Sequence, residues 1–143
     1  MRQLQHAITV TNRGRGFTNI TRDIQQWISE SDIETGILNL FVQHTSCSLM
    51  IQENADPDVL RDMETFFSKL VPDGDPMFRH RAEGPDDMPA HIRMALTQVS
   101  LNVPITGGRL ALGIWQGIYL YEHRQHSMHR RVQLHLTGES FSS

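Results

Sequence analysis

The chain has 143 residues, of which 38% are hydrophobic and 20% are charged, and its net charge is −3. This length suits one domain with a single core, over residues 1–143, and the composition indicates a globular rather than a disordered protein. The weak charge gives no reason to expect nucleic acid or an anionic membrane as a partner. Arginine outnumbers lysine twelve to one. That bias modestly favours anion binding, although genomic base composition explains it better.

The single cysteine, Cys47, excludes a disulfide framework and makes the cytoplasm the expected compartment. The first residues, MRQLQHAITVTNRGRG, lack the apolar core of a signal peptide, and no apolar run is long enough to span a membrane. We therefore expect a cytoplasmic protein without a membrane partner.

Alternating apolar residues predict four strands in the first part of the chain. These strands cover residues 4–11, 17–20, 37–44 and 49–52. Between the second and third strands, Thr21 can cap a helix whose inner face carries Ile24, Trp27 and Ile28.

Asp56 followed by Pro57 predicts the start of a helix, because aspartate favours the cap position and proline the first helical position. Apolar residues then recur at helical spacing until Pro72 ends the pattern. A long polar loop over residues 72–87 follows, of a length that is often functional or disordered. A short helix is expected over about residues 88–98. Its predicted inward residues are Ile92, Ala95, Leu96 and Val99.

From Leu101 onward the pattern is that of β-strands, with a hairpin around Gly107 and Gly108. Strict alternation marks the strands around Leu120 and Leu134. The total is roughly eight short strands and three helices. This count predicts an α+β domain built on antiparallel sheet, arranged as a sandwich or a flattened barrel.

Three histidines are candidates for one site. His44 ends a predicted strand, His80 lies in the long loop, and His91 lies on the short helix. Their imidazoles could converge on a divalent transition metal with one position open for a ligand. Nearby carboxylates that could complete or orient this shell are Glu83, Asp86 and Asp87. The alternative is three independent histidines that hydrogen-bond loop backbone, because no HxH or HExxH spacing is present.

Cys47 lies three residues after His44, which raises the possibility of a thiol nucleophile. Positions three apart in a strand face opposite sides, so we interpret Cys47 as a buried core residue. Neighbouring polar side chains could line a pocket or form the turn before the next helix. They are Thr45, Ser46, Ser48 and Asn54. Arg124, Arg130 and Arg131 could grip a phosphate or be solvated turn residues.

Four sequence blocks together resemble the YjbQ family of secondary thiamine-phosphate synthases. They are HTSCSLMIQENADPDV, EGPDDMPAHIRMAL, VPITGGRLALGIWQGIYLYEHR and RRVQLHLTGE. The resemblance runs from the first strand to about Glu139. It implies an antiparallel β-sandwich of jelly-roll type, a homotrimer, and a polar pocket between subunits. This chain departs from the family pattern at Cys47 and at Asp87, where the family more often has other residues.

Carried over residue by residue, the resemblance implies three groups of site residues. The metal ligands would be His44, His80 and His91, holding a divalent ion such as zinc or magnesium. The pocket would be lined by Thr45, Ser48, Asn54 and Gln116. The catalytic residues would be Asp87 and Glu122, to which we add Arg130 from the arginine cluster near the end of the chain.

The resemblance implies a metal-dependent enzyme that joins hydroxymethylpyrimidine diphosphate to thiazole phosphate, as a minor activity. A divalent cation and basic side chains would stabilise the leaving diphosphate. Two alternatives use the same residues. One is metal-assisted hydrolysis of a small phosphorylated or acyl substrate, and the other is a trimeric module that binds a metal or anion without turnover.

Overall fold

The structure is a computed structural model that describes residues 1–142. Within that range the chain forms eight strands and three helices, as predicted. The strands are β1 (Arg2–Thr11), β2 (Gly16–Asn19), β3 (Ile33–Val42), β4 (Cys47–Glu53), β5 (Ser100–Thr106), β6 (Arg109–Leu110), β7 (Gln116–Glu122) and β8 (His129–Ser140). The helices are α1 (Thr21–Glu30), α2 (Pro57–Leu70) and α3 (Asp87–Leu96).

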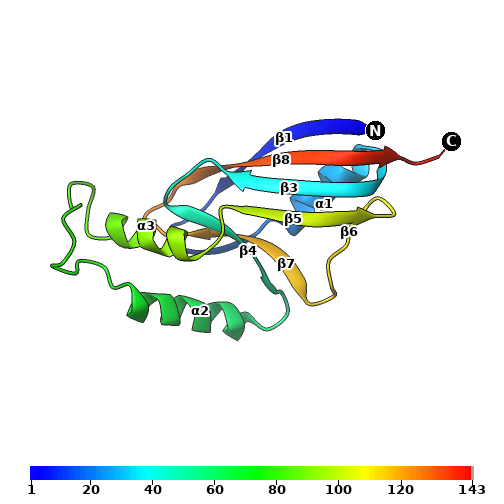
Figure 1. Ribbon diagram of the computed structural model, residues 1–143. Helices are drawn as coiled ribbons and strands as arrows, with labels where there is room; N and C mark the ends of the chain where they lie inside the picture. The colour runs from blue at the N-terminus through cyan, green and yellow to red at the C-terminus, as the bar shows by residue number, and fades with distance from the viewer. Residues whose placement is uncertain (143) are drawn as a thin grey trace.

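The strands form two sheets in which every pairing is antiparallel. The larger sheet has the order β1-β8-β3-β5-β6 and the smaller has the order β2-β7-β4. Figure 1 shows the long strands of the larger sheet side by side in one layer, with β4 and β7 below them. The predicted α+β architecture with antiparallel sheets is confirmed. These strand orders do not establish the jelly-roll sandwich, which stays a prediction.

The core lies between the two sheets and α1. Val132, Leu134 and Leu136 of β8 are at most 1% exposed, and the residues between them are only half-buried. Their register partners on β3 are Val42, Leu40 and Leu38, which are equally buried. Burying each such side chain stabilises the fold by about 1.5–3 kcal/mol. The apolar residues that alternate along β8 in the sequence are therefore the ones that this strand contributes to the core.

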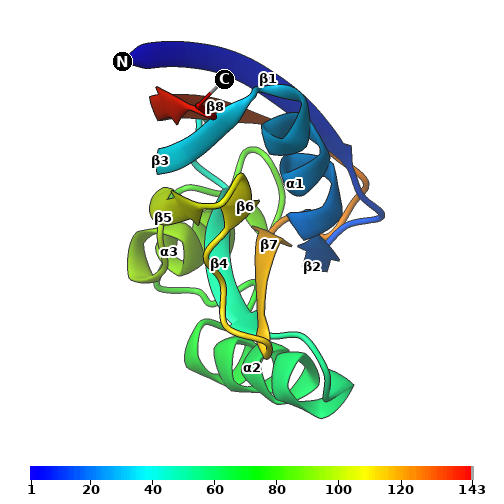
Figure 2. The ribbon, with the colours of Figure 1, turned by 90° about the vertical axis from the view of Figure 1, so that its right-hand side faces the viewer.

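The helices α1 and α2 differ in how they meet the sheets. Ile24 and Ile28 of α1 are buried in the core, as predicted. Asp56 caps α2 by accepting the backbone N–H of Asp58, as the sequence also predicts. However, no residue of α2 is buried, and Phe66 is 62% exposed. Figure 2 shows α2 at the lower end of the molecule, away from the larger sheet. None of the helices in residues 1–142 is long and apolar enough to cross a membrane.

Helix α3 buries a different face from the predicted one. Its buried residues include Ala90 and Arg93, while Leu96 is 57% exposed, so the predicted inward face is wrong. The reason is an ion pair: Arg93 Nη1 lies 2.8 Å from Glu64 Oε1 on α2. The Tyr121 hydroxyl donates to the same Glu64 oxygen over 2.6 Å. These bonds turn the guanidinium inward, and they tie α2 to α3 and β7.

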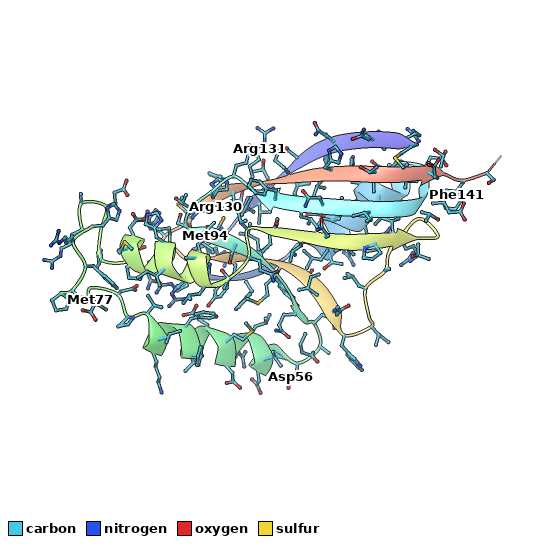
Figure 3. The ribbon with its side chains drawn as sticks, viewed as in Figure 1. Asp56, Met77, Met94, Arg130, Arg131 and Phe141 are labelled. Carbon is cyan, nitrogen blue, oxygen red and sulfur yellow. The ribbon has the colours of Figure 1, made fainter. Side chains whose placement is uncertain are left out.

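The segment between α2 and α3 folds back on itself before α3 begins. The backbone N–H of Gly74 donates to the carbonyl oxygen of Pro85 over 3.0 Å, which brings the two ends of the segment together. Figure 3 labels Met77 at the outer part of this segment and Asp56 at the start of α2. We call residues 74–85 the connecting loop. This loop places His80 beside the first turns of α3.

Candidate metal centre

His80, Asp87 and His91 bring their possible ligand atoms within 4.8 Å of one another. Asp87 and His91 are four residues apart on α3 and therefore share one face of the helix. His80 reaches the same point from the connecting loop. Its Nε2 lies 2.6 Å from Asp87 Oδ2, and Nε2 of His91 lies 3.1 Å from the same oxygen. Two of the three predicted histidine ligands thus meet around a carboxylate predicted to be catalytic.

Asp87 is held from behind by Arg124. Its side chain is only 3% exposed, and Nη1 of Arg124 lies 2.9 Å from Oδ1. The same guanidinium contacts Asp86 Oδ2 at 3.0 Å and donates to the carbonyl oxygen of Glu83 at 2.9 Å. These contacts occupy one oxygen of Asp87 and leave Oδ2 toward the two histidines. A carboxylate fixed in this way can offer one oxygen to a metal.

The hydrogen bond at the far side of the His91 ring determines which nitrogen is available. His91 Nδ1 lies 2.8 Å from the carbonyl oxygen of Thr45. A carbonyl oxygen only accepts, so Nδ1 carries the hydrogen, and a neutral ring then has its lone pair on Nε2. That lone pair faces Asp87 Oδ2, which is also an acceptor. The contact is favourable only with a proton or a cation between the two atoms.

The site carries excess negative charge. Three carboxylates, Glu83, Asp86 and Asp87, stand against one guanidinium, that of Arg124. The hydrogen bond that His80 donates to Asp87 raises the pKa of His80. Burial alone would raise the pKa of Asp87, but the bond with His80 and the nearby positive charges hold it below its usual value. The His80 and His91 side chains are 43% and 31% exposed, so the site is open to solvent.

His44, the third predicted ligand, does not belong to this cluster. It follows β3, and its Nε2 accepts the backbone N–H of Arg131 over 2.9 Å. Its Nδ1 lies 3.4 Å from a nitrogen of Arg130. Burial, helped by the charge of Arg130, lowers the pKa of His44. Figure 3 shows Arg130 and Arg131 where β8 begins, beside the end of β3. Both ring nitrogens of His44 therefore face groups of β8.

Glu122 and Arg130, predicted to be catalytic, form a buried ion pair beneath the surface. Arg130 contacts both oxygens of Glu122, at 2.7 and 2.5 Å. Glu122 also accepts from the side chain of Asn12 and from the backbone N–H groups of His123 and Arg124. Its side chain is 0% exposed. A carboxylate with five donors and no access to solvent fixes the corner between β7 and β8. Its geometry is that of a structural residue.

The predicted pocket residues fall in two separate regions. Thr45 contributes its carbonyl oxygen to His91, and the Ser48 hydroxyl lies 2.9 Å from Nε2 of the buried His123. Asn54 and Gln116 instead hold the turn before β7, where the Asn54 amide donates to two carbonyl oxygens. The β4–β7 ladder separates these regions by six residues, about 20 Å. One pocket cannot therefore be lined by all four side chains.

Cys47 is fully buried, as predicted, and burial raises the pKa of its thiol to about 12. It is therefore a packing residue and not a thiolate nucleophile. His123, for which the sequence raised no expectation, is also 0% exposed. Its position shares the strand parity of the aromatic Tyr119 and Tyr121, and that parity could have identified it. The contact of Arg124 with Asp87 was not expected either, because the sequence has no local signal for it.

Comparison with known proteins identifies close relatives along nearly the whole chain. A family model described as "UPF0047 protein YjbQ-like" matches residues 6–139. The UPF0047 protein sll1880 of Synechocystis is 50% identical over 138 residues, covering 96% of this chain and 94% of the relative. The UPF0047 protein YjbQ of Salmonella typhimurium is 47% identical over 136 residues, covering 94% and 98%.

Solved structures share the fold. An uncharacterised protein of the YjbQ/UPF0047 family from Clostridium acetobutylicum has a TM-score of 0.81 at 31% identity, covering 94% of this chain and 99% of that one. A protein from Sulfolobus solfataricus, described as YbjQ-like and of unknown function, has a TM-score of 0.83 at 20% identity, covering 96% and 100%. The second likeness concerns the fold alone.

These descriptions correct the functional expectation. The family and its members carry the UPF0047 designation, and one of the solved structures is described as having unknown function. None of these descriptions names a thiamine-phosphate synthase activity, so that prediction is wrong. The two alternatives, metal-assisted hydrolysis and a non-catalytic trimeric module, are not favoured by these relatives either. The resemblance to YjbQ proteins itself is confirmed.

Proposed function

The chain belongs to the YjbQ-like UPF0047 family, and we propose that it binds a divalent transition metal on His80, Asp87 and His91. The observation that carries this proposal is the His91 ring. Its Nδ1–H is directed to the Thr45 carbonyl, which leaves the Nε2 lone pair aimed at Asp87 Oδ2. Histidine ligands in metal sites are commonly held in this way by a second hydrogen bond.

The donor set indicates which metals fit. Two imidazoles and one carboxylate suit zinc, iron or cobalt, whereas magnesium prefers oxygen ligands and retained water. We therefore propose a transition metal in place of the zinc-or-magnesium alternative left open by the sequence. Three protein ligands leave at least one coordination position open. A metal there would supply Lewis-acid chemistry to whatever ligand occupies that position.

The charge around the site supports the same proposal. Three carboxylates and one guanidinium leave two negative charges, which one divalent ion would neutralise. Arg124 would hold Asp87 as a ligand through one oxygen. Glu83, whose Oε2 lies 3.4 Å from His80 Nε2, is exposed and could orient the His80 ring or add a ligand.

The test is metal binding by the chelator-treated protein. We expect Zn²⁺ to bind with one ion per chain and Co²⁺ to give the visible absorption of a site with nitrogen ligands. His91→Gln and Asp87→Asn should each weaken Zn²⁺ binding by about 100-fold or more, because each removes one of three ligands. Competition with a coloured chelator measures the affinity.

The control is His126→Gln, which changes an exposed histidine outside the cluster and should leave the affinity unchanged. The proposal fails if the wild-type chain takes up no Zn²⁺ or Co²⁺. It also fails if Asp87→Asn and His126→Gln bind the ion equally well.

We also propose that the chain associates with copies of itself, as the predicted homotrimer requires. The outer face of the larger sheet supports this, because a twelve-residue patch of it among the described residues carries no Asp, Glu, Lys or Arg. The patch consists of Gln3, Gln5, Ala7, Ile37, Asn39, Phe41, Ser100, Asn102, Pro104, Gln133, His135 and Thr137. Ile37 and Phe41 are 55% and 42% exposed. Depletion of charge around exposed apolar residues is typical of the centre of an interface.

Sedimentation velocity tests this second proposal. The wild-type chain should sediment as an oligomer, three copies being the expected stoichiometry, and Phe41→Glu should shift it to the monomer. A monomeric wild type would contradict the proposal.

A further inference from the structure

A groove of about 450 Å³ lies between α2 and β4. Its walls include Met63 and Phe67 of α2, Met50 and Ile51 of β4, and Leu96 at the end of α3. Figure 1 shows α2 running below β4, with α3 at one side. None of the described residues that line this groove is charged. We call it the α2–β4 groove, and its apolar walls suit the side chains of a bound ligand.

The strand β4 presents one backbone edge to this groove. Among residues 1–142, β7 is its only ladder partner. On the other side of β4, the N–H of Leu49 donates to the carbonyl oxygen of Gln98 over 2.7 Å. Every second residue of an antiparallel strand directs its backbone groups to the same edge, so the N–H and C=O of Ile51 also point away from β7. The register partner of Ile51 agrees with this direction, since the carbonyl oxygen of Ile118 accepts the backbone N–H of Ile20 on the far side of β7.

This edge is open at Ile51 because α3 ends beside it. Gln98 pairs with Leu49 in the antiparallel direction. Two residues further along β4, the antiparallel partner of Ile51 would be Leu96, but Leu96 is the last residue of α3 and its backbone is helical. The N–H and C=O of Ile51 therefore have no hydrogen-bond partner among residues 1–142. An unpaired edge of this kind is a template for a further strand.

The end of the groove where β4 leads into α2 is acidic. The ten residues from Glu53 to Asp62 include four carboxylates and one guanidinium, that of Arg61, which pairs with Asp58. The other three carboxylates have no ion-pair partner at 4.0 Å or less within residues 1–142. A ligand with positive charge at this end would therefore be attracted to it.

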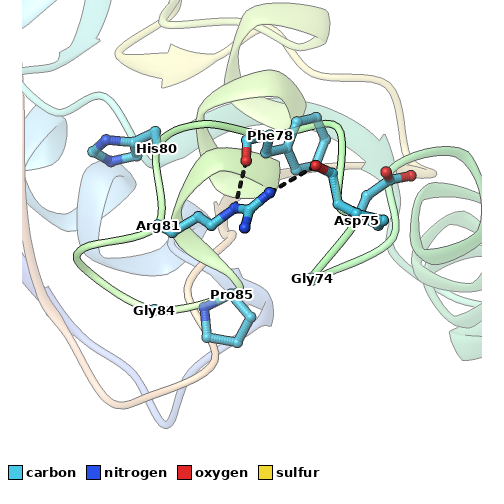
Figure 4. A pocket seen from close by; sticks show the side chains of 8 residues that line it. Gly74, Asp75, Phe78, His80, Arg81, Gly84 and Pro85 are labelled. Carbon is cyan, nitrogen blue, oxygen red and sulfur yellow. Dashed lines mark hydrogen bonds between the residues drawn. The ribbon is translucent and has the colours of Figure 1, made fainter.

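The cavity within the connecting loop differs from this groove, although its volume of about 410 Å³ is similar. Nε of Arg81 donates to the carbonyl oxygen of Phe78 over 2.6 Å, and Nη2 donates to that of Pro76 over 2.7 Å. Figure 4 shows both bonds inside the loop. The guanidinium thus joins backbone groups of the loop to one another. In the α2–β4 groove, by contrast, the backbone groups of Ile51 are left for a partner.

We propose that the α2–β4 groove binds an extended peptide segment of a partner protein by β-strand addition. The segment would have apolar residues at alternate positions and lysine or arginine at the end nearest to Glu53. Its main chain would bond to the N–H and C=O of Ile51, while one row of its side chains would contact Met63 and Phe67. Main-chain bonds and pockets for alternate side chains are the two components of this mode of recognition.

The direction of the bound segment follows from the fold. Every strand pairing in the two sheets is antiparallel, and so is the bridge between Leu49 and Gln98 on the same edge. An antiparallel segment has its amino end beside the carboxyl end of β4, where Glu53 begins the acidic stretch. The basic residues of the segment should therefore precede its apolar residues.

This surface is independent of both functions proposed above. The metal-site residues His80, Asp87 and His91 do not line the groove, and neither does any member of the uncharged patch on the larger sheet. Peptide binding should therefore persist in protein treated with a chelator. It should also persist whether the chain is a monomer or an oligomer formed through that patch.

The experiment is an NMR titration of the isotope-labelled full chain in the presence of EDTA. The probe is an end-capped peptide of two lysines followed by three valine–threonine pairs, and fluorescence anisotropy of a labelled copy measures its affinity. We expect saturable shifts at the amides of Ile51, Gln98 and Met63. A peptide with two glutamates in place of the lysines should bind about 10-fold more weakly, because like charges then meet at the acidic end.

N-methylated peptides test the main-chain bonds on the wild-type chain. One peptide carries methyl groups on its valine nitrogens and another on its threonine nitrogens, so that each lacks the donors of one edge. One of the two should bind about 10-fold or more weakly, because its lost donors are those that face Ile51. If both bind as tightly as the unmodified peptide, no strand is added and the proposal is wrong.

Met63→Lys places a positive charge in the wall of the groove and should weaken the lysine peptide about 10-fold or more. Leu70→Lys is the matched control, since Leu70 is 54% exposed on the same helix and does not line the groove. It should keep the affinity within about twofold of the wild type. Equal binding by the two variants would overturn the proposal.

Two further results would overturn it. One is the absence of saturable shifts on addition of the lysine peptide. The other is that the amides of Ile51 and Gln98 shift on dilution of the protein but not on addition of peptide, because a second copy of the chain would then occupy the groove. The peptide series needs no substitution in the chain, so the proposal stays testable if Met63→Lys does not fold.

Discussion

Asp87 and Glu122 are two buried carboxylates near the same corner of the molecule, and each contacts an arginine, yet their surroundings differ. Glu122 is 0% exposed and accepts five hydrogen bonds from donors that the fold supplies. Asp87 gives one oxygen to Arg124 and turns the other toward two solvent-accessible histidines. Residue type and burial are therefore poor guides to function here. What separates the two sites is whether the fold already supplies every partner.

The largest effect should come from a substitution at Glu122, where the fold supplies every hydrogen-bond donor. Glu122→Gln leaves the guanidinium of Arg130 buried without a counter-charge, which should lower the free energy of unfolding by about 3–5 kcal/mol. Urea denaturation of the purified chain measures this. Glu139→Gln is the control, since Glu139 is 65% exposed in its ion pair and should change stability by less than about 0.5 kcal/mol. A loss below about 1 kcal/mol for Glu122→Gln would remove the structural role that we assign to Glu122.

The second prediction uses His123, whose backbone N–H is one of the donors to Glu122. Burial, together with the charges of Arg93, Arg15 and Arg130, lowers the pKa of His123 to about 3. Unfolded histidine has a pKa near 6.5, so below that pH the unfolded state binds a proton that the native state excludes. His123 should therefore reduce stability as pH falls, by about 1.5–2 kcal/mol between pH 6.5 and 5.

Denaturation at several pH values measures this contribution as the difference between the wild type and His123→Gln. The glutamine can still bond to Ser48, and the variant should lose much less stability than the wild type over this interval. His126→Gln, at an exposed position, should retain the wild-type slope. His80 acts in the opposite direction, because a raised pKa gives stability that is fully present below the unfolded pKa and is lost as the pH rises through the folded pKa. Parallel slopes for the wild type and His123→Gln would show that His123 titrates in the native state.

The third prediction concerns the arginine behind Asp87. Arg124→Lys keeps the positive charge but cannot span Asp86, Asp87 and the Glu83 carbonyl together. The orientation of Asp87 should loosen, and Zn²⁺ affinity should fall about 10-fold without loss of binding. Arg79→Lys, an exchange at an exposed position of the connecting loop, should leave the affinity unchanged. If Arg124→Lys binds as tightly as the wild type, Arg124 has no positioning role at this site.

Local signals predicted the fold well. The alternation in β8 and the cap formed by Asp56 and Pro57 depend on neighbouring residues, and the structure has both. The buried face of α3 escaped prediction, because Arg93 turns inward for Glu64, 29 residues earlier in the chain. The spacing of apolar residues along a helix cannot predict this, because such a pattern assigns every arginine to the exposed face.

The candidate site was predicted in part for the same reason. Asp87 and His91 share a helix face, so their spacing alone brings them together. The approach of His80 depends on how the connecting loop closes, which the sequence leaves open. The polar residues near Cys47 gave a single predicted pocket, whereas the β4–β7 ladder places Ser48 and Gln116 at opposite ends. Of the predicted pocket residues, Thr45 therefore contacts the metal-site residue His91, whereas Asn54 holds the turn before β7.

The smallest expected effect is the one that separates the predicted three-histidine site from the observed cluster. His44→Gln should leave Zn²⁺ affinity within about twofold of the wild type, because Nε2 of His44 already accepts the backbone N–H of Arg131. A glutamine oxygen can accept the same N–H, so the corner should stay folded. His91→Gln in parallel supplies the contrast, since it removes a nitrogen that faces Asp87. If both variants lost the metal equally, His44 would have to leave Arg131 on metal binding, and the three-histidine site read from the sequence would replace the cluster centred on Asp87.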